Sequence, residues 1–180
     1  DAAKKAIDSG VDGLICVNRR AGGHAGTLSP EELLEDLGDL GVPLTCAGGI
    51  GSPDGFKEAL EMGYAGVQLG TRFIATEECS AHQDYKDAIV KAQAEDIVLT
   101  EKISGVDVAV IKTPYIEKTG TKAGWLMKRM LRHRKLKHYA RMYYSLTSMW
   151  KLKRSNLKGQ SYKDFFQAGK SVEGITSVDS

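Results

Sequence analysis

Residues 42–54 read Val-Pro-Leu-Thr-Cys-Ala-Gly-Gly-Ile-Gly-Ser-Pro-Asp and carry the clearest signal of the architecture. The stretch begins with a short apolar run, which is typical of a buried strand, and passes into a glycine-rich loop. It ends on Ser52-Pro53-Asp54, where serine suits the N-cap of a helix, proline its first position and aspartate its first turn. The stretch therefore predicts a strand, a loop and a helix in immediate succession.

The same succession is repeated on both sides of this stretch. The predicted strands cover residues 11–17, 42–47 and 65–69, and the predicted helices cover residues 2–9, 29–40 and 52–63. The strands are apolar throughout, which is typical of parallel strands covered on both faces. This pattern predicts an α/β fold, either a doubly wound sheet or a barrel. Three strands cannot close an eight-stranded barrel, so in that case we expect a fragment whose early strands precede Asp1.

The second half of the chain has a different character. Residues 70–73 are expected to form a loop, residues 80–95 a helix, and residues 97–112 two strands that turn at Ser104-Gly105. A basic helical region follows over residues 122–150, and a last short helix is expected over residues 164–175. We therefore divide the chain into residues 1–96, with the βα units, and residues 97–180, a small β-hairpin with a basic helical extension.

The composition is that of a soluble globular domain. The chain has 180 residues, of which 42% are hydrophobic and 27% charged. No apolar run reaches the roughly 20 residues of a membrane-spanning helix, and no signal peptide is visible. Three widely spaced cysteines argue against a disulfide framework and against structural zinc, and they favour the reducing cytoplasm. We predict no metal site, because the histidines lack ligand spacing with any acid or cysteine.

The charge is divided unequally between the two halves. Residues 1–100 hold 8 basic and 17 acidic residues, whereas residues 101–180 hold 17 and 6. Residues 118–163 contain no acidic residue at all. This basic segment could be a solvated helix face that balances the acidic half, a contact for a large anionic substrate such as an acyl carrier, or a contact for nucleic acid or a membrane. Attraction between the two oppositely charged halves is the simplest interpretation.

The glycine-rich loops are the candidate site, because each follows the carboxyl end of a predicted strand, where parallel α/β folds bind ligands. Gly48-Gly49 and Gly70-Thr71 follow consecutive strands, so they predict a phosphate site; the alternative is that the glycines only make tight turns. His24 lies in the glycine-rich loop of residues 21–26. It could titrate near neutrality and lie against a ligand, or it could be a solvated loop histidine.

Three ordered motifs resemble a known family. Ala-Gly-Gly-His-Ala-Gly at residues 21–26, Pro-Leu-Thr-Cys-Ala-Gly-Gly-Ile-Gly at residues 43–51 and Gly-Val-Gln-Leu-Gly-Thr-Arg-Phe-Ile-Ala-Thr-Glu-Glu at residues 66–78 resemble the nitronate monooxygenases, formerly called 2-nitropropane dioxygenases. The flavin-dependent enoyl-acyl-carrier-protein reductases share the pattern. The resemblance covers residues 1–118 well, and Gln167-Ala168-Gly169-Lys170-Ser171 resembles the closing helix of the family.

The resemblance implies the C-terminal part of an FMN-binding TIM barrel with a small additional domain. It implies that Gly48, Gly49 and Gly70 bind the FMN phosphate, with Thr71 adjacent. Three further assignments follow from it: His24 is the active-site histidine, Gly22 and Gly23 run close to the flavin, and Gln68 faces the cofactor or the barrel mouth. The early barrel strands, which supply much of the contact with the flavin ring in the family, are not in this chain.

The implied activity is FMN-dependent oxidative denitrification of alkyl nitronates or nitroalkanes with molecular oxygen. His24 would act as the base or as a hydrogen-bond donor to the nitro oxygens. The alternatives are an NADH- and FMN-dependent enoyl-thioester reductase and, in another class, a non-catalytic polyanion-binding module. We expect a small-molecule substrate and no nucleic acid, and a homodimer is compatible with this assignment. One departure is Arg20, after Arg19, where many members are acidic; the pair could favour an anionic substrate or face solvent.

Overall fold

The computed structural model describes residues 2–103, 105–122, 124–125 and 165–180, and the single positions 129, 133, 136, 138, 139, 142 and 146. Its parallel sheet contains β1 (Leu14–Val17), β2 (Leu44–Ala47) and β3 (Gly66–Gln68), and its antiparallel sheet contains β4 (Ile97–Thr100) and β5 (Val108–Ile111). The α-helices are α1 (Ala2–Asp8), α2 (Pro30–Leu37), α3 (Pro53–Met62), α4 (Thr71–Ile74), α5 (Gln83–Lys91) and α6 (Pro114–Thr119). The 3-10 helices are η1 (Gly38–Leu40), η2 (Ala94–Asp96) and η3 (Lys170–Gly174).

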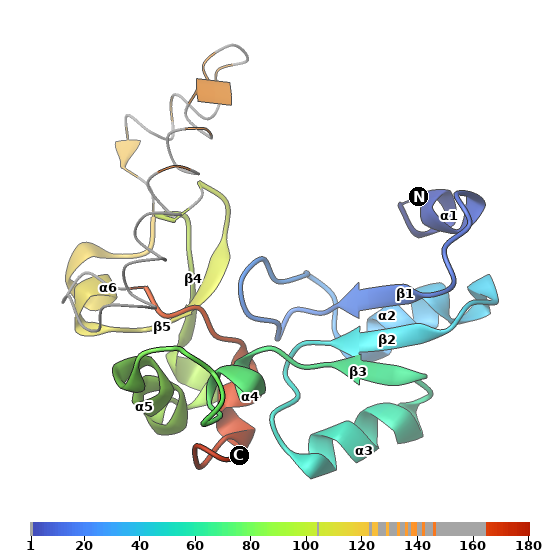
Figure 1. Cartoon of the computed structure of the whole chain (residues 1–180). Helices are drawn as coiled ribbons and strands as arrows, with labels where there is room; N and C mark the ends of the chain where they lie inside the picture. The colour runs from blue at the N-terminus through green and yellow to red at the C-terminus, as the bar shows by residue number, and fades with distance from the viewer. Residues whose placement is uncertain are drawn as a thin grey trace.

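The strands of the parallel sheet follow one another in chain order, β1-β2-β3, each joined to the next through a helix (Figure 1). Cys16 pairs with Cys46 and Cys46 with Val67, so the three strands end at one edge of the sheet. This confirms the prediction of an α/β fold with parallel strands.

Helices α2 and α3 cover one face of the parallel sheet. Cys16, Leu44 and Cys46 point to that face and form a core with Ala59 of α3, against which leucines of α2 pack. On the opposite face Ile15 is 61% exposed, so within the described residues the prediction of cover on both faces is wrong. Apolar strands indicate burial on both faces only when the whole barrel or sheet is present, and the described part contains three parallel strands.

The start of α2 shows why the sequence pattern was informative. The hydroxyl of Ser29 accepts from the backbone N–H of Glu32 at 3.2 Å, and the Glu32 carboxylate accepts from the backbone N–H of Ser29 at 2.6 Å. Pro30 occupies the first turn. This reciprocal capping box satisfies two N–H groups that the helix itself cannot pair.

We expect Ser29→Ala to lower the free energy of unfolding by about 1 kcal/mol, because both ends of the capping box depend on this residue. The measurement is urea denaturation followed by circular dichroism. Ser9→Ala is the matched control, since its hydroxyl is exposed at the end of α1 and the expected change is within about 0.5 kcal/mol. Equal effects of the two substitutions would contradict the assigned role of the cap.

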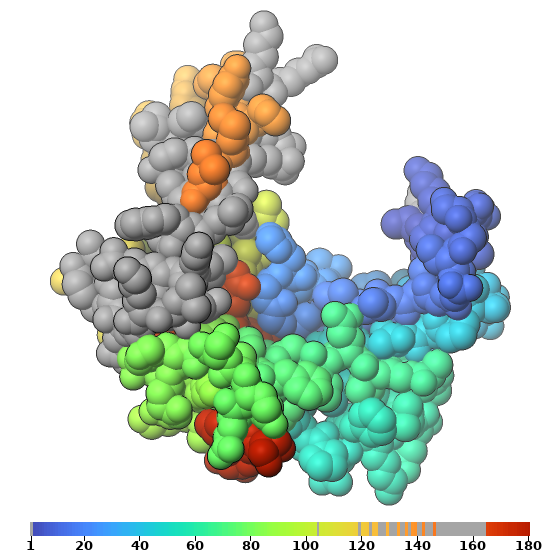
Figure 2. Space-filling model, in the orientation of Figure 1, coloured from blue at the N-terminus to red at the C-terminus, as the bar shows by residue number. Residues whose placement is uncertain are grey.

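The second half of the molecule is built around the C-terminal segment, which we define as residues 165–175. It runs beside β5, where Ile111 donates to the carbonyl of Phe166 at 2.8 Å, and then reaches the loop after β1, where Lys170 donates to the carbonyl of Arg20 at 2.8 Å. Beyond it, Glu77 donates to the carbonyl of Asp179. Figure 2 shows these last residues, in red, packed beside the green residues of α4 and α5. The segment therefore ties the hairpin and α5 to the parallel sheet.

Two local predictions need correction. The expected loop at residues 70–73 contains α4, a single helical turn in which Phe73 donates to the carbonyl of Gly70. The expected helix at residues 164–175 is extended at first and becomes the 3-10 helix η3 only from Lys170. Its extended part pairs with β5, which a local helical pattern cannot reveal. The hairpin at residues 97–112 is confirmed, and most of the predicted basic helical region at residues 122–150 lies outside the described residues.

Candidate functional site

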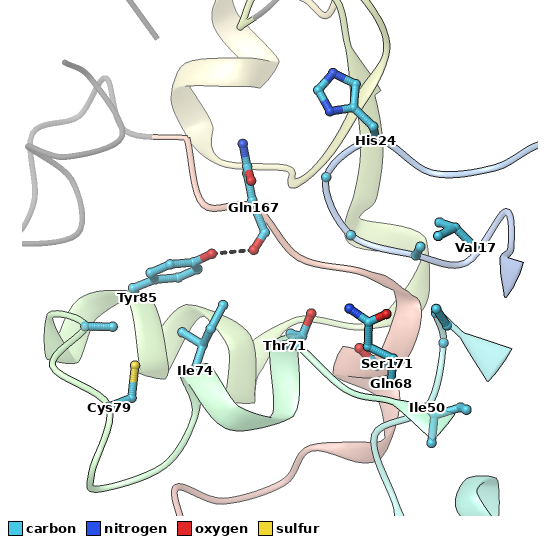
Figure 3. Close-up of a pocket in the computed structure, with 18 of the residues that line it drawn as sticks. Val17, His24, Ile50, Gln68, Thr71, Ile74, Cys79, Tyr85, Gln167 and Ser171 are labelled. Atoms are coloured by element: carbon cyan, nitrogen blue, oxygen red, sulfur yellow. Dashed lines mark hydrogen bonds between the residues drawn. The ribbon is translucent and has the colours of Figure 1, made fainter. Parts of the chain in front are cut away.

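A cavity of about 750 Å³ opens where the three parallel strands end. Val17, Ala47 and Gln68, the last residues of β1, β2 and β3, all line it (Figure 3). The structure brings every predicted catalytic or cofactor-binding residue to this one cavity: Gly22, Gly23, His24, Gly48, Gly49, Gln68, Gly70 and Thr71. The loops lie together because parallel strands deliver their following loops to the same edge of the sheet.

The loop after β2 forms a cradle that only glycine can build. Gly48 and Gly49 have φ angles of 116° and 79°, which are unfavourable for residues with a side chain. A Cβ atom on Gly48 would lie 2.6 Å from the backbone nitrogen of Ala21. Within the described part of the chain, the N–H groups of Gly48 and Gly49 donate to no other group. Successive unpaired N–H groups in such a loop suit an anion, so these residues fit the phosphate of FMN.

Asn18, which was not predicted from the sequence, organises this cradle. Its side chain is fully buried; the amide nitrogen donates to the carbonyl of Gly48 at 2.9 Å, and the amide oxygen accepts from the N–H of Arg20 at 2.8 Å. The Asn18 carbonyl also accepts from Ala21 and Gly26. A single side chain thus joins the loop after β1 to the loop after β2. The available signal was a polar residue directly after an apolar strand.

The loop after β3 contributes Gly70 and Thr71. Thr71 is buried, and its hydroxyl oxygen accepts from the backbone N–H of Gly169 in the C-terminal segment at 3.1 Å. Since the oxygen accepts this bond, the hydroxyl hydrogen is left to donate. Gly70 precedes the helical turn α4, and a Cβ there would meet no atom within 4 Å. The loop can therefore complete the cradle begun by Gly48 and Gly49.

The loop after β1 carries His24 to the outer part of the cavity (Figure 3). It is fixed by its neighbours: Ala109 of β5 donates to the carbonyl of Gly23 at 2.7 Å. A Cβ on Gly22 would lie 2.8 Å from the backbone nitrogen of Gly169, so only glycine allows this approach. The His24 side chain is exposed to solvent, which leaves its ring accessible to a ligand in the cavity.

A second wall of the cavity is mostly apolar and was not singled out from the sequence. It includes Ile74, Cys79 and Tyr85 (Figure 3). Tyr85 stacks on Phe166 with ring centroids 4.7 Å apart, and its hydroxyl donates to the backbone carbonyl of Gln167. Burial raises the pKa of Tyr85, so it remains a neutral donor at physiological pH. No local pattern pointed to these residues, because their contacts join segments far apart in the sequence.

The lining of the cavity does not include Cys46, His82, Arg19 or Arg20. Cys46 is a small buried residue, and burial raises the pKa of its thiol. His82 caps α5, because its Nδ1 accepts from the N–H of Asp84 at 3.2 Å. Arg19 and Arg20 form exposed ion pairs with Glu32 and Glu173, which favours the solvent-facing interpretation of this pair. In the described residues no three side chains of the metal-ligating types gather.

A parallel α/β sheet whose strands end at one cavity has the arrangement found at the carboxyl edge of a TIM barrel. None of the helices described is both long and apolar enough to cross a membrane. The sequence matches the family model for nitronate monooxygenase over residues 1–160. The chain therefore belongs to the nitronate monooxygenase family, whose members are flavin-dependent oxidoreductases.

Individual relatives agree with this membership. A probable nitronate monooxygenase of Staphylococcus aureus is 30% identical over 120 residues, which are 61% of this chain and 34% of the relative. A Mycobacterium tuberculosis protein named (3aS,4S,5R,7aS)-5-hydroxy-7a-methyl-1-oxo-octahydro-1H-indene-4-carboxyl-CoA dehydrogenase is 32% identical over 120 residues, 64% of this chain and 34% of that protein. The chain spans about a third of the length of these relatives.

Solved structures show the same fold. FabK from Thermotoga maritima superimposes with a TM-score of 0.77 and 28% identity, covering 98% of this chain and 53% of FabK. The nitroalkane oxidase from Streptomyces ansochromogenes gives a TM-score of 0.72 at 20% identity, covering 98% of this chain and 50% of that one, and shows the likeness of fold alone. The chain thus corresponds to about half of each of these structures.

Proposed function

We propose that this chain provides the phosphate-binding and histidine-bearing part of an FMN-dependent nitronate monooxygenase. Residues 1–96 would form the last βα units of the TIM barrel, and residues 97–180 its additional small domain. The observation that carries the proposal is the convergence of three sequence-distant loops on one cavity at the strand ends. The family membership supports it. The proposal includes a small-molecule substrate, molecular oxygen and a cytoplasmic location.

The proposed contacts with FMN come from the loops after all three parallel strands. The N–H groups of Gly48, Gly49 and Gly70, with the hydroxyl of Thr71, would bind the phosphate of FMN. Gly22 and Gly23 would let the backbone approach the flavin closely, and Gln68 would face the cofactor from the end of β3. When bound, FMN supplies the acceptor for the electrons of the nitronate and the site of reaction with oxygen.

His24 would act on the substrate at the outer part of the cavity. Its imidazole can remove the proton on the carbon next to a nitro group, or donate a hydrogen bond to the oxygens of a nitronate that arrives already deprotonated. Either role requires an accessible ring on a fixed backbone. The exposed side chain and the bond between Ala109 and Gly23 supply these two conditions.

An enoyl-thioester reductase that uses NADH and FMN is the second candidate. The observation in its favour is the likeness to FabK, an enoyl-acyl-carrier-protein reductase, over nearly the whole chain. The reductant distinguishes the two: a nitronate reduces the flavin directly in the first case, and NADH does so in the second. The polyanion-binding alternative rests on the basic residues 118–163, most of which lie outside the described residues.

A flavin titration tests the proposal, using this chain and, in parallel, the chain with its upstream coding sequence. We expect a saturable change in the visible spectrum with FMN, and an affinity for riboflavin at least tenfold lower, because riboflavin lacks the phosphate that the cradle binds. Anaerobic reduction by a nitronate rather than NADH then supports the monooxygenase. Equal affinity for the two flavins, or no binding in either form of the chain, would overturn the proposal.

A further inference from the structure

The C-terminal segment is extended at residues 165–169, and the side chain of Gln167 is less buried than those of its neighbours. Phe165, Phe166, Ala168 and Gly169 are buried, whereas Gln167 is only partly buried and lines the cavity. The neighbours pack into the cores around β5 and α5. Gln167 is thus the position at which the extended part of this segment, residues 165–169, presents a polar side chain to the cavity.

The backbone of Gln167 is held from three directions. Gln167 forms an antiparallel bridge with Val110 of β5. Its carbonyl accepts from the hydroxyl of Tyr85, and Gly169, two residues later, donates to the hydroxyl oxygen of Thr71 at 3.1 Å. Because the backbone of Gln167 is already fixed, less conformational entropy is lost when its side chain binds a ligand.

The side chain lies beside the loop that carries His24. A Cβ added to Gly23 would lie 3.8 Å from the amide oxygen of Gln167, so this amide lies near the loop. Figure 3 shows the Gln167 amide and the His24 ring in the upper part of the view, above Thr71 and Gln68. The glycine cradle of Gly48 and Gly49 belongs to a different part, at the end of β2.

We propose that Gln167 is a substrate-binding residue that holds an oxygen of the substrate's polar group opposite His24. This inference rests on the proposed function and extends it. A glutamine amide offers a donor that does not titrate, so it can bind the negative oxygen of a nitronate at every pH at which the enzyme works. Tyr85 is a positioning residue, because its hydroxyl donates to the backbone carbonyl of Gln167.

The test compares two variants of the FMN-loaded protein, Gln167→Leu and Gln83→Leu. Leucine keeps most of the glutamine volume but cannot donate, and a hydrogen bond to a charged group is worth about 10-fold to 100-fold in binding. We expect Gln167→Leu to raise KM for propane 2-nitronate by that factor, with kcat and the affinity for FMN nearly unchanged. Gln83 is exposed on α5, outside the cavity, and serves as the matched control with unchanged kinetics.

Two further variants separate binding from structure. Gln167→Glu places a carboxylate at the same position, so KM for the anionic nitronate should rise above that of Gln167→Leu. Tyr85→Phe should raise KM less, again without loss of FMN. A wild-type KM in Gln167→Leu, in a protein that oxidises nitronate, would overturn the role of Gln167 alone. A wild-type protein that binds FMN but does not oxidise nitronate would overturn the proposed function, and this inference with it.

Discussion

Replacing His24 with alanine is expected to lower kcat/KM for a nitroalkane by about 100-fold to 10,000-fold, the usual contribution of a positioned acid or base. The affinity for FMN should stay the same, because the proposed phosphate contacts come from Gly48, Gly49 and Gly70 in other loops. The ring is exposed at the outer part of the cavity, so its removal leaves no hole in a core. Steady-state kinetics and a flavin titration measure the two quantities.

The choice of substrate separates the two roles of His24. A neutral nitroalkane needs a base to remove its proton, whereas a nitronate needs only a hydrogen-bond donor. His24→Gln can still donate but is not a base, so it should lose turnover with the nitroalkane and keep much of it with the nitronate. His82→Ala is the control, since His82 caps α5 outside the cavity. Wild-type turnover in His24→Ala with both substrates would remove this residue from the mechanism.

The βα units could be predicted because their signals are local. Ser29 and Ser52 begin α2 and α3 at the expected positions, and each accepts a hydrogen bond from a backbone N–H of the first turn. The glycine loops could be assigned to one site because parallel strands end at one edge of a sheet. For these features, a few adjacent residues contain the physical cause of the structure.

The residues that were missed act across large separations in the sequence. Asn18 bonds Gly48, 30 residues later, and Tyr85 bonds the carbonyl of Gln167, 82 residues later. A local pattern does not reveal either contact, because Asn18 is only a polar residue after an apolar strand and Tyr85 resembles an ordinary apolar residue of a helix. The extended conformation of residues 165–169 was missed for the same reason, since it depends on pairing with β5.

These long-range contacts make the C-terminal segment part of the site. It lines the cavity through Gln167 and Ser171, and it bonds the loop after β1 through Lys170 and the loop after β3 through Gly169. A Cβ on Gly51 would lie 2.0 Å from the carbonyl oxygen of Ser171, so the segment also touches the loop after β2. All three loops of the proposed cofactor site are therefore braced by one stretch of chain.

Gly48→Ala should have the largest effect on the cofactor. The substitution forces a side chain onto a residue with φ of 116°, at a cost of about 1–3 kcal/mol, and its Cβ would meet the backbone of Ala21 at 2.6 Å. Because backbone cannot move aside as a flexible side chain does, the loop itself must shift. We expect the affinity for FMN to fall at least tenfold, to the level of riboflavin, together with a lower free energy of unfolding.

Two other glycines make this prediction decisive. Gly38→Ala is the control: its φ is −58°, a Cβ there meets nothing within 4 Å, and it should leave FMN binding unchanged. Gly70→Ala is equally free of clashes, so the protein should fold, but the methyl group enters the open space beside the cradle. Gly70→Ala should therefore lower the affinity for FMN more than the affinity for riboflavin. If Gly48→Ala and Gly70→Ala both fold and bind FMN as the wild type does, the phosphate is held elsewhere, because these loops are where the proposed contacts converge.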